Sequence, residues 1–125
     1  MGYLVYMTLM CVLIPITMLV IGIIFIKKPP RSINSIYGYR TDYSMKNQDT
    51  WDFAHKYIGR IWFALGLVLL VLFTATSILA YMFFYERFDD ICGLLCLLGV
   101  AGLIVPIIPT EIALKKTFDK NGNKK

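Results

Sequence analysis

The chain has 125 residues, of which 58% are hydrophobic and only 17% are charged, and its formal net charge is +5. Average soluble domains are about 45–50% apolar and about 25% charged, so this composition argues against a soluble globular domain. The length is enough for one domain, residues 1–125. Its apolar residues are concentrated in three runs that contain no charged side chain: residues 3–26, 61–85 and 91–108.

Each of the three runs is long enough to cross a bilayer as a helix. An uncharged apolar stretch of about 18 residues is a transmembrane candidate, and at about 1.5 Å per residue the shortest run reaches about 27 Å. A soluble bundle of three such helices would leave almost no polar face for water. The sequence therefore predicts an all-α integral membrane protein with three transmembrane helices.

The first run, residues 3–26, is interpreted as a retained helix rather than a secretory signal peptide. It lacks a basic segment before it, and lysines and prolines follow it where a cleavage site would have small residues. Pro29 and Pro30 end the helix, because proline cannot donate a backbone hydrogen bond and restricts the residue before it. A polar loop, residues 27–60, comes next.

The end of this loop predicts an amphipathic helix that leads into the second span. Asn47 or Asp49 is the expected N-terminal cap. One helical stripe of apolar residues follows at helical spacing: Trp51, Ala54, Ile58 and Trp62. The helix is expected either to run on or to bend near Gly59. His55 falls outside that stripe and is expected to be solvated or interfacial.

After the second span, an external loop of about five residues, 86–90, makes the second and third spans antiparallel neighbours. Pro106 and Pro109 are expected to close the third span. The tail, residues 109–125, is predicted to form a short amphipathic segment capped by Thr110. Leu114 and Phe118 would give this segment an apolar edge at the membrane surface. Residues 121–125 are expected to be disordered.

The basic residues are distributed very unevenly. Twelve of the thirteen Lys and Arg residues lie in the loop 27–60 and the tail 109–125, and only Arg87 lies in the external loop. The positive-inside rule then predicts a multi-pass protein of the cell membrane, with its N-terminus outside and the loop and C-terminus in the cytoplasm. This distribution explains the net charge without direct nucleic-acid binding.

The inventory of reactive residues argues against an enzyme. His55 is the only histidine, and neither a His-Glu-x-x-His nor a Cys-x-x-Cys motif occurs. No charged residue lies inside a span, where transporters keep ion sites and proton relays. Cys92 and Cys96 share a helix face but have no histidine nearby in sequence, so they are interpreted as small packing residues. No metal or cofactor is expected.

The loop contains an unusual set of aromatic, polar and basic residues that a simple connector does not need. Two interpretations stay open for it. It could be an interfacial loop folded under the bundle, with Arg40 paired with Asp42 or with a helix C-terminus, or it could be a recognition surface. The candidate partner-binding or loop-structuring residues are Asn34, Tyr37, Gly38, Tyr39, Arg40, Thr41, Ser44, Asn47 and Trp51.

The spacing of these residues resembles the signature of the SdpI family of bacterial membrane proteins. The matching pattern is Asn34-x-x-Tyr37-Gly38-Tyr39-Arg40-Thr41-x-x-Ser44-Met45-x-Asn47-x-x-x-Trp51-x-x-Ala54. The late Pro106-x-x-Pro109-Thr110-Glu111, with Phe118 in the tail, is also similar to the end of the family's three-helix unit.

The resemblance implies immunity or signalling by binding rather than catalysis. The best-known member of the family protects cells from a secreted toxin peptide and recruits an autorepressor to the membrane. It is longer, with additional spans. Besides the lipid bilayer, the implied partners are a toxin peptide or a cytoplasmic repressor protein, and a homo-oligomer is also considered. The alternative is a small oligomeric transport or lipid-handling component, with Arg40 and the tyrosines holding a lipid head group.

Overall fold

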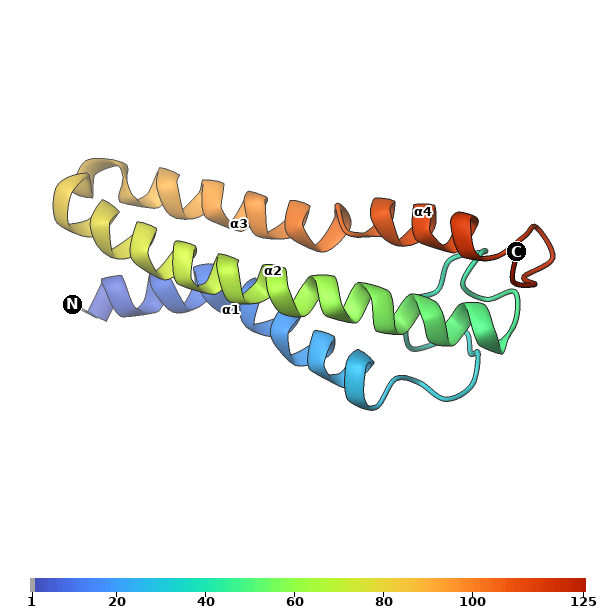
Figure 1. The fold of residues 1–125 in the computed structure, drawn as a ribbon. Coiled ribbons are helices and arrows are strands. Elements are labelled where there is room, and N and C mark those ends of the chain that lie inside the picture. Colours follow the sequence, from blue (N-terminus) through green and yellow to red (C-terminus); the bar gives the residue numbers. More distant parts are fainter. Residues whose placement is uncertain (1) are drawn as a thin grey trace.

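The structure is a computed structural model that describes residues 2–125. Its elements are α1 (Gly2–Lys27), α2 (Gln48–Phe83), a short 3-10 turn η1 (Tyr85–Arg87), α3 (Phe88–Ile104) and α4 (Ile107–Thr117). The long helices run side by side, with the N-terminus and the α2–α3 connection at one end and the loop and C-terminus at the other (Figure 1). The predicted all-α fold is confirmed.

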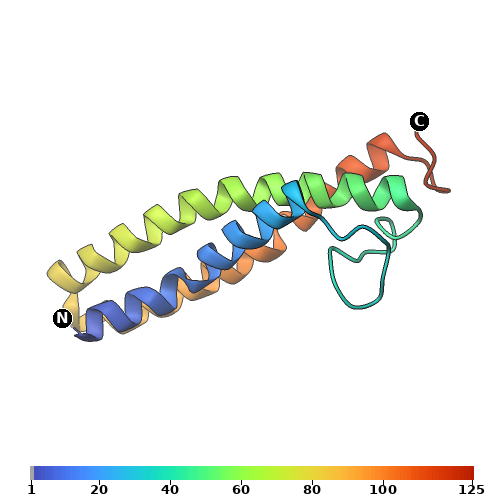
Figure 2. The ribbon, with the colours of Figure 1, turned by 90° about the horizontal axis from the view of Figure 1, so that it is seen from below.

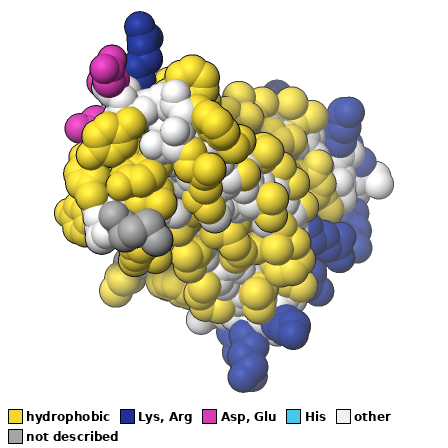
Figure 3. All heavy atoms as spheres, turned by 90° about the vertical axis from the view of Figure 1, so that its left-hand side faces the viewer, with side chains coloured by type: hydrophobic (Ala, Val, Ile, Leu, Met, Phe, Trp, Pro, Cys, Tyr) yellow, Lys and Arg dark blue, Asp and Glu magenta, His cyan; other side chains and the backbone are white. Residues whose placement is uncertain are grey.

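Three helical segments are long and apolar enough to cross a membrane: Gly2–Lys27, Gln48–Phe83 and Tyr85–Thr117. Hydrophobic side chains cover most of the surface seen from the end where α2 meets α3, and most of the visible Lys and Arg side chains lie toward the far end (Figure 3). Large exposed hydrophobic side chains lie on α1, α2 and α3, so this surface is suited to lipid rather than water. The chain is therefore a multi-pass membrane protein. Its orientation relative to the two membrane faces stays a prediction from the charge distribution.

Helices α1 and α2 approach each other closely through glycines. A Cβ added at Gly22 would lie 2.8 Å from the backbone nitrogen of Phe63, and one added at Gly66 would lie 3.1 Å from the carbonyl oxygen of Pro15. Small residues let helix backbones meet in lipid, where no hydrophobic effect drives helices together. The α1–α2 pair is therefore the closely packed frame on which the loop between them is mounted.

The half of the bundle that contains the N-terminus and the α2–α3 connection is held by an apolar cluster and by one contact between hydroxyls. Thr8 Oγ1 and Ser77 Oγ lie 3.0 Å apart and join α1 to α2. Cys92 is buried against Cys11, as expected for a packing residue. The buried members of the cluster are Cys11, Val12, Phe73, Ala80, Phe88, Cys92 and Leu95.

Helix α2 begins before the membrane and continues into it without a break at Gly59. Asn47 is its N-terminal cap. The Asn47 side chain accepts the N–H of Thr50 at 2.9 Å, and the Thr50 hydroxyl accepts the N–H of Asn47 at 3.1 Å. Two otherwise unpaired backbone donors are satisfied in this way. The first of the two predicted caps is therefore confirmed, and the helix runs on rather than bending.

The third span differs from its prediction. Helix α3 ends at Ile104, and α4 starts at Ile107 and continues in nearly the same direction (Figure 1). Pro106 lies just before α4, where its missing N–H costs no helix bond. The expectation that Thr110 caps a helix is wrong, because Thr110 lies inside α4 and its hydroxyl donates to the carbonyl oxygen of Pro106 at 2.8 Å.

The tail also differs from its prediction. Leu114 and Phe118 are 0% and 1% exposed, because α4 packs against α2 rather than lying on the membrane surface. The last residues were expected to be disordered, but Phe118 pairs with Lys124 in an isolated β-bridge. Asp119 supports this turn by accepting the backbone N–H groups of Asn121 and Asn123.

Candidate functional site

The loop between α1 and α2 lies at the end of the bundle where the chain also terminates (Figures 1 and 2). It has two parts with different surroundings. The loop base consists of the buried or half-buried residues that pack on the first turns of α2: Gly38, Tyr39, Thr41, Ser44, Asn47, Thr50, Trp51 and His55. The loop tip consists of residues 34–37 and Arg40.

His55 is the centre of the loop base. It is 0% exposed, which overturns the expectation of a solvated or interfacial residue. Its Nε2 accepts the backbone N–H of Tyr39 at 2.8 Å, so this nitrogen carries no proton. Its Nδ1 lies 2.7 Å from the carbonyl oxygen of Trp51 and donates to it. His55 is therefore a neutral imidazole with both ring nitrogens in use.

Burial lowers the pKa of His55 below its usual value, because the charged form loses its hydration. The carbonyl of Trp51 and the negative charge of Asp52 act in the opposite direction and are weaker. The neutral form is consequently the one that fits the loop base.

Gly38 brings the loop backbone against this histidine. Its φ is +119°, which side chains of L-residues rarely adopt. A Cβ at this position would lie 2.7 Å from His55 Nε2 and 3.1 Å from the Trp51 ring. The loop backbone therefore approaches an internal ring closely at this position.

Trp51 fixes the first part of the loop to α2. Its side chain is 0% exposed, and its indole Nε1 donates to the carbonyl oxygen of Pro30 at 2.7 Å. The Trp51 and His55 rings lie 4.3 Å apart between centroids, as expected for two residues four positions apart on one helix face. The segment that leaves α1 is therefore held against the start of α2.

Ser44 organises the turn of the loop base. Its hydroxyl donates to the carbonyl oxygen of Tyr39 at 2.9 Å and accepts the N–H of Thr41 at 2.9 Å. In return, the Thr41 hydroxyl accepts the N–H of Ser44 at 3.2 Å. The Thr50 hydroxyl lies 3.0 Å from the carbonyl oxygen of Ser44. Buried polar groups of this kind are costly unless they are paired, and here they are paired with one another.

The loop base is also tied to the end of the chain. The Tyr39 hydroxyl donates to Glu111 of α4 at 2.8 Å, and burial together with this carboxylate raises the pKa of Tyr39 well above its usual value. The Tyr43 hydroxyl donates to the carbonyl oxygen of Phe118 at 2.6 Å. Asn47 Nδ2 donates to the carbonyl oxygen of Gly122 at 2.6 Å.

The loop tip is the more exposed part of the loop. Asn34 shapes it by accepting the backbone N–H groups of Ile36 at 3.0 Å and Tyr37 at 2.6 Å. Ile36 is 88% exposed and Tyr37 is 46% exposed. Arg40 is also exposed and donates to the carbonyl oxygen of Ser35 at 2.5 Å. The tip therefore presents an aliphatic, an aromatic and a guanidinium group.

The pairing of Arg40 with Asp42 or a helix C-terminus, one of the two interpretations left open, is not formed, and the guanidinium bonds within the tip instead. Exposed ion pairs contribute little in water. The hydrogen bond from Arg40 to the carbonyl oxygen of Ser35 can therefore form in place of an ion pair with Asp42. The predicted residues thus separate: Asn34, Tyr37 and Arg40 form the tip, and the others form the base. Sequence reasoning missed His55, Thr50 and Glu111. For His55 the signal was its position four residues after Trp51.

Within residues 2–125, no group of three or more His, Cys, Asp or Glu side chains is arranged to hold a metal ion. The groups that the loop offers are hydrogen-bonding groups, aromatic rings and exposed side chains. Such an arrangement can bind a partner without supplying a reactive group.

Comparison with known proteins identifies the family. The sequence matches the SdpI/YfhL protein family over residues 31–110, which is more than half of the chain. It is also similar to the uncharacterized protein YfhL of Bacillus subtilis (strain 168), with 44% identity over 52 residues, or 42% of this chain. That match covers 47% of the relative, about half its length. No solved structure matches. The chain therefore belongs to the SdpI/YfhL protein family.

Proposed function

We propose that this chain is an SdpI-like membrane protein of the immunity or signalling type, which acts by binding through the loop tip. The observation that carries the proposal is the contrast in exposure. Ile36 is 88% exposed, only a few residues from base residues that are almost fully buried. Aromatic and arginine side chains are the types that most often dominate binding energy at protein interfaces. The tip offers both in Tyr37 and Arg40.

A rigid mounting favours this use of the tip. A flexible loop loses conformational freedom when it binds, and this loss reduces affinity. Here Gly38 and Tyr39, which lie between Tyr37 and Arg40 of the tip, are held by His55, and Pro30 before the tip is held by Trp51. The tip is therefore held at both of its ends before any partner arrives.

The chemistry of the tip favours a partner with an acidic or carbonyl-rich surface. Arg40 uses one nitrogen on Ser35, which leaves its other N–H groups to bind a carboxylate or backbone carbonyls. The charge distribution predicts that the tip faces the cytoplasm, so a cytoplasmic repressor protein fits this position. The toxin peptide would then act on the bundle, and the tip would transmit its presence by holding or releasing the partner.

The burial and hydrogen bonding of His55, the one histidine of the chain, favour binding over catalysis. Both ring nitrogens of His55 are committed to backbone groups, and its side chain is fully buried. A general base must reach the proton that it abstracts. Of the carboxylates at this end, Glu111 accepts a hydrogen bond from Tyr39, Asp52 from Gln48 and Asp119 from backbone N–H groups, and the others are exposed.

A protection assay tests the proposal. Cells that express the chain would be challenged with cognate and unrelated membrane-active peptides, and survival would be compared with that of cells lacking it. We expect protection against at least one peptide and its loss in an Arg40→Ala variant that still inserts. Arg60→Ala is the matched control, because it removes an equally exposed arginine from α2.

Three outcomes would count against the proposal. Absence of protection against every peptide would favour the lipid-handling alternative. Equal protection by the Arg40→Ala and Arg60→Ala variants would remove the tip from the mechanism. Degradation or failed insertion of the Arg40→Ala variant alone would show that closing the tip onto Ser35 is its role.

A further inference from the structure

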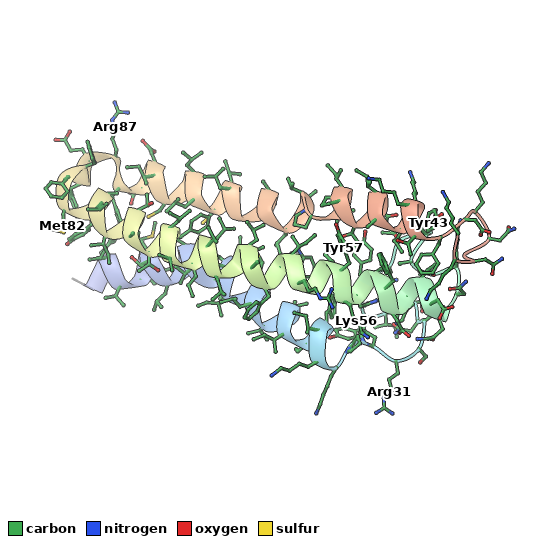
Figure 4. The ribbon with its side chains drawn as sticks, viewed as in Figure 1. Arg31, Tyr43, Lys56, Tyr57, Met82 and Arg87 are labelled. Atoms are coloured by element: carbon green, nitrogen blue, oxygen red, sulfur yellow. The ribbon has the colours of Figure 1, made fainter. Side chains whose placement is uncertain are left out.

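A basic hollow of about 590 Å³ opens between the end of α1 and the start of α2. It is separate from the loop tip. Figure 4 shows Lys56 on the side of α2 that faces the segment after α1, and Arg31 projecting outward from that segment. The charged and polar residues that line the hollow are Lys27, Lys28, Arg31, Gln48, Asp52 and Lys56.

The charges of this hollow are unbalanced. Four cationic side chains face one carboxylate, Asp52. Asp52 accepts a hydrogen bond from the Gln48 amide at 2.8 Å. Within residues 2–125, none of the four cations forms an ion pair. The excess of positive over negative charge around the hollow creates a positive potential that attracts an anion.

Part of the backbone in the wall of the hollow is already hydrogen-bonded. Backbone carbonyl oxygens would repel a negative group, but two that border the hollow are already occupied. Trp51 Nε1 donates to the carbonyl oxygen of Pro30 at 2.7 Å, and Gln48 Nε2 donates to that of Arg31 at 2.5 Å. The same two hydrogen bonds fix the segment after α1 against α2. The hollow between them is therefore formed before any ligand binds.

An apolar hollow adjoins the basic one. It has a volume of about 330 Å³ and is lined by Ile23, Ile26, Lys27 and Phe63, of which Ile26 and Lys27 also line the basic hollow. Lys27 is the last residue of α1, directly after the uncharged run of the first span. The two hollows therefore meet where apolar surface gives way to charged surface, which is where a lipid's head group joins its chains.

We propose that the basic hollow binds the phosphate of an anionic phospholipid, with an acyl chain of that lipid in the adjoining apolar hollow. Basic pockets between helices at the cytoplasmic side of a membrane suit such head groups. The lysines supply compact charges to the phosphate. Arg31, which projects outward at the rim, closes over the phosphate by rotating its side chain. The inference does not depend on the proposed role of the loop tip.

The test compares two double variants that each remove two lysine charges at the same end of the molecule. Lys28→Gln with Lys56→Gln empties the hollow of half its cations. Lys116→Gln with Lys124→Gln is the matched control, because both residues are exposed and neither lines either hollow. Circular dichroism would verify the helix content of both before binding is measured on the full chain in a nonionic detergent.

Three probes would be titrated by calorimetry: a short-chain phosphatidylglycerol, a short-chain phosphatidylcholine and inorganic phosphate. We expect phosphatidylglycerol to bind the unmodified chain most tightly. Each lysine near an anionic head group contributes enough for about a fivefold effect, so the Lys28/Lys56 pair should weaken this binding about 25-fold. The Lys116/Lys124 pair should change it by less than about twofold.

Two results would overturn the inference. Equal weakening by both pairs would show that phosphatidylglycerol responds to the net charge of the surface and not to the hollow. Inorganic phosphate binding as tightly as phosphatidylglycerol would show that the apolar hollow contributes nothing and that the ligand is no lipid. If the Lys28/Lys56 pair unfolds the chain, the Lys56→Gln variant against Lys124→Gln makes the same comparison, with an expected effect of about fivefold.

Discussion

The loop base and the loop tip come from one continuous motif, yet they have opposite surroundings. In the base, Ser44, Thr50 and His55 are 0% exposed and bonded to one another or to the backbone. In the tip, Ile36 is 88% exposed and its side chain has no comparable support. The comparison teaches that residues of one recognisable signature need not share a role. The base maintains the fold, and the tip is what a partner can reach.

A substitution at Gly38 should destabilise the loop base strongly. A Gly38→Ala variant adds a Cβ 2.7 Å from His55 Nε2 at a φ of +119°. Residues forced into such a backbone region cost about 1–3 kcal/mol even without a clash, so we expect a loss of at least about 2 kcal/mol. Unfolding by sodium dodecyl sulfate, followed by tryptophan fluorescence, would measure it because Trp51 reports on the base.

The control for this variant is Gly93→Ala. A Cβ at Gly93 would meet nothing within 4 Å, and in a helix alanine is preferred to glycine. Its stability should equal or slightly exceed that of the unmodified chain. A Gly38→Ala variant as stable as Gly93→Ala would contradict the packing of the loop base described above.

Lowering the pH should destabilise the loop base through protonation of His55. The pKa of His55 is lowered in the folded protein. The unfolded chain therefore binds more protons than the folded chain, and the free energy of unfolding rises with pH. The contribution of His55 is complete above its unfolded pKa of about 6.5 and is lost as pH falls toward the folded pKa. The slope cannot exceed about 1.4 kcal/mol per pH unit.

Denaturation of the protein at a series of pH values between 5 and 8 would measure this slope. His55 is the only histidine in the chain, and most carboxylates titrate below this range. A His55→Gln variant should be less stable at pH 7.5 and should lose the pH dependence between pH 5 and 7. An unchanged slope in that variant would mean that another group titrates there.

The smallest effect on stability is expected in the tip. Ile36→Ser should change the free energy of unfolding by less than about 0.5 kcal/mol, because an exposed side chain loses little by truncation. It should nevertheless reduce protection in the peptide-challenge assay. Ile58→Ala gives the contrasting result: Ile58 is 0% exposed in the core of the base, and such a truncation costs about 2–5 kcal/mol. Full protection by Ile36→Ser would show that Ile36 is dispensable for recognition.

Local features of the fold could be predicted from the sequence. The three apolar runs indicated the spans, because lipid demands long uncharged helices. Asn47 could be predicted as a cap because a cap bonds within its own turn. In each case, the deciding interaction lies within a few residues or with the solvent.

The failures concern contacts between residues far apart in the chain. Tyr39 reaches Glu111, and Asn47 reaches Gly122. Local periodicity does not encode such pairs, so residues 121–125 were expected to be disordered and His55 to be solvated or interfacial. The apolar stripe defined only one face of α2, whereas the loop covers a second face and buries His55 there.

The amino-acid sequence alone predicted that this chain crosses the membrane with three helices and that all but one of its basic residues lie on one side of it. Those properties depend on transfer of side chains between water and lipid, which each segment undergoes separately. Only the tertiary structure decided which motif residues are buried in the base and which remain exposed in the tip. The reason is that burial in the loop depends on its contacts with α2, α4 and the tail. These contacts form only when the whole bundle packs.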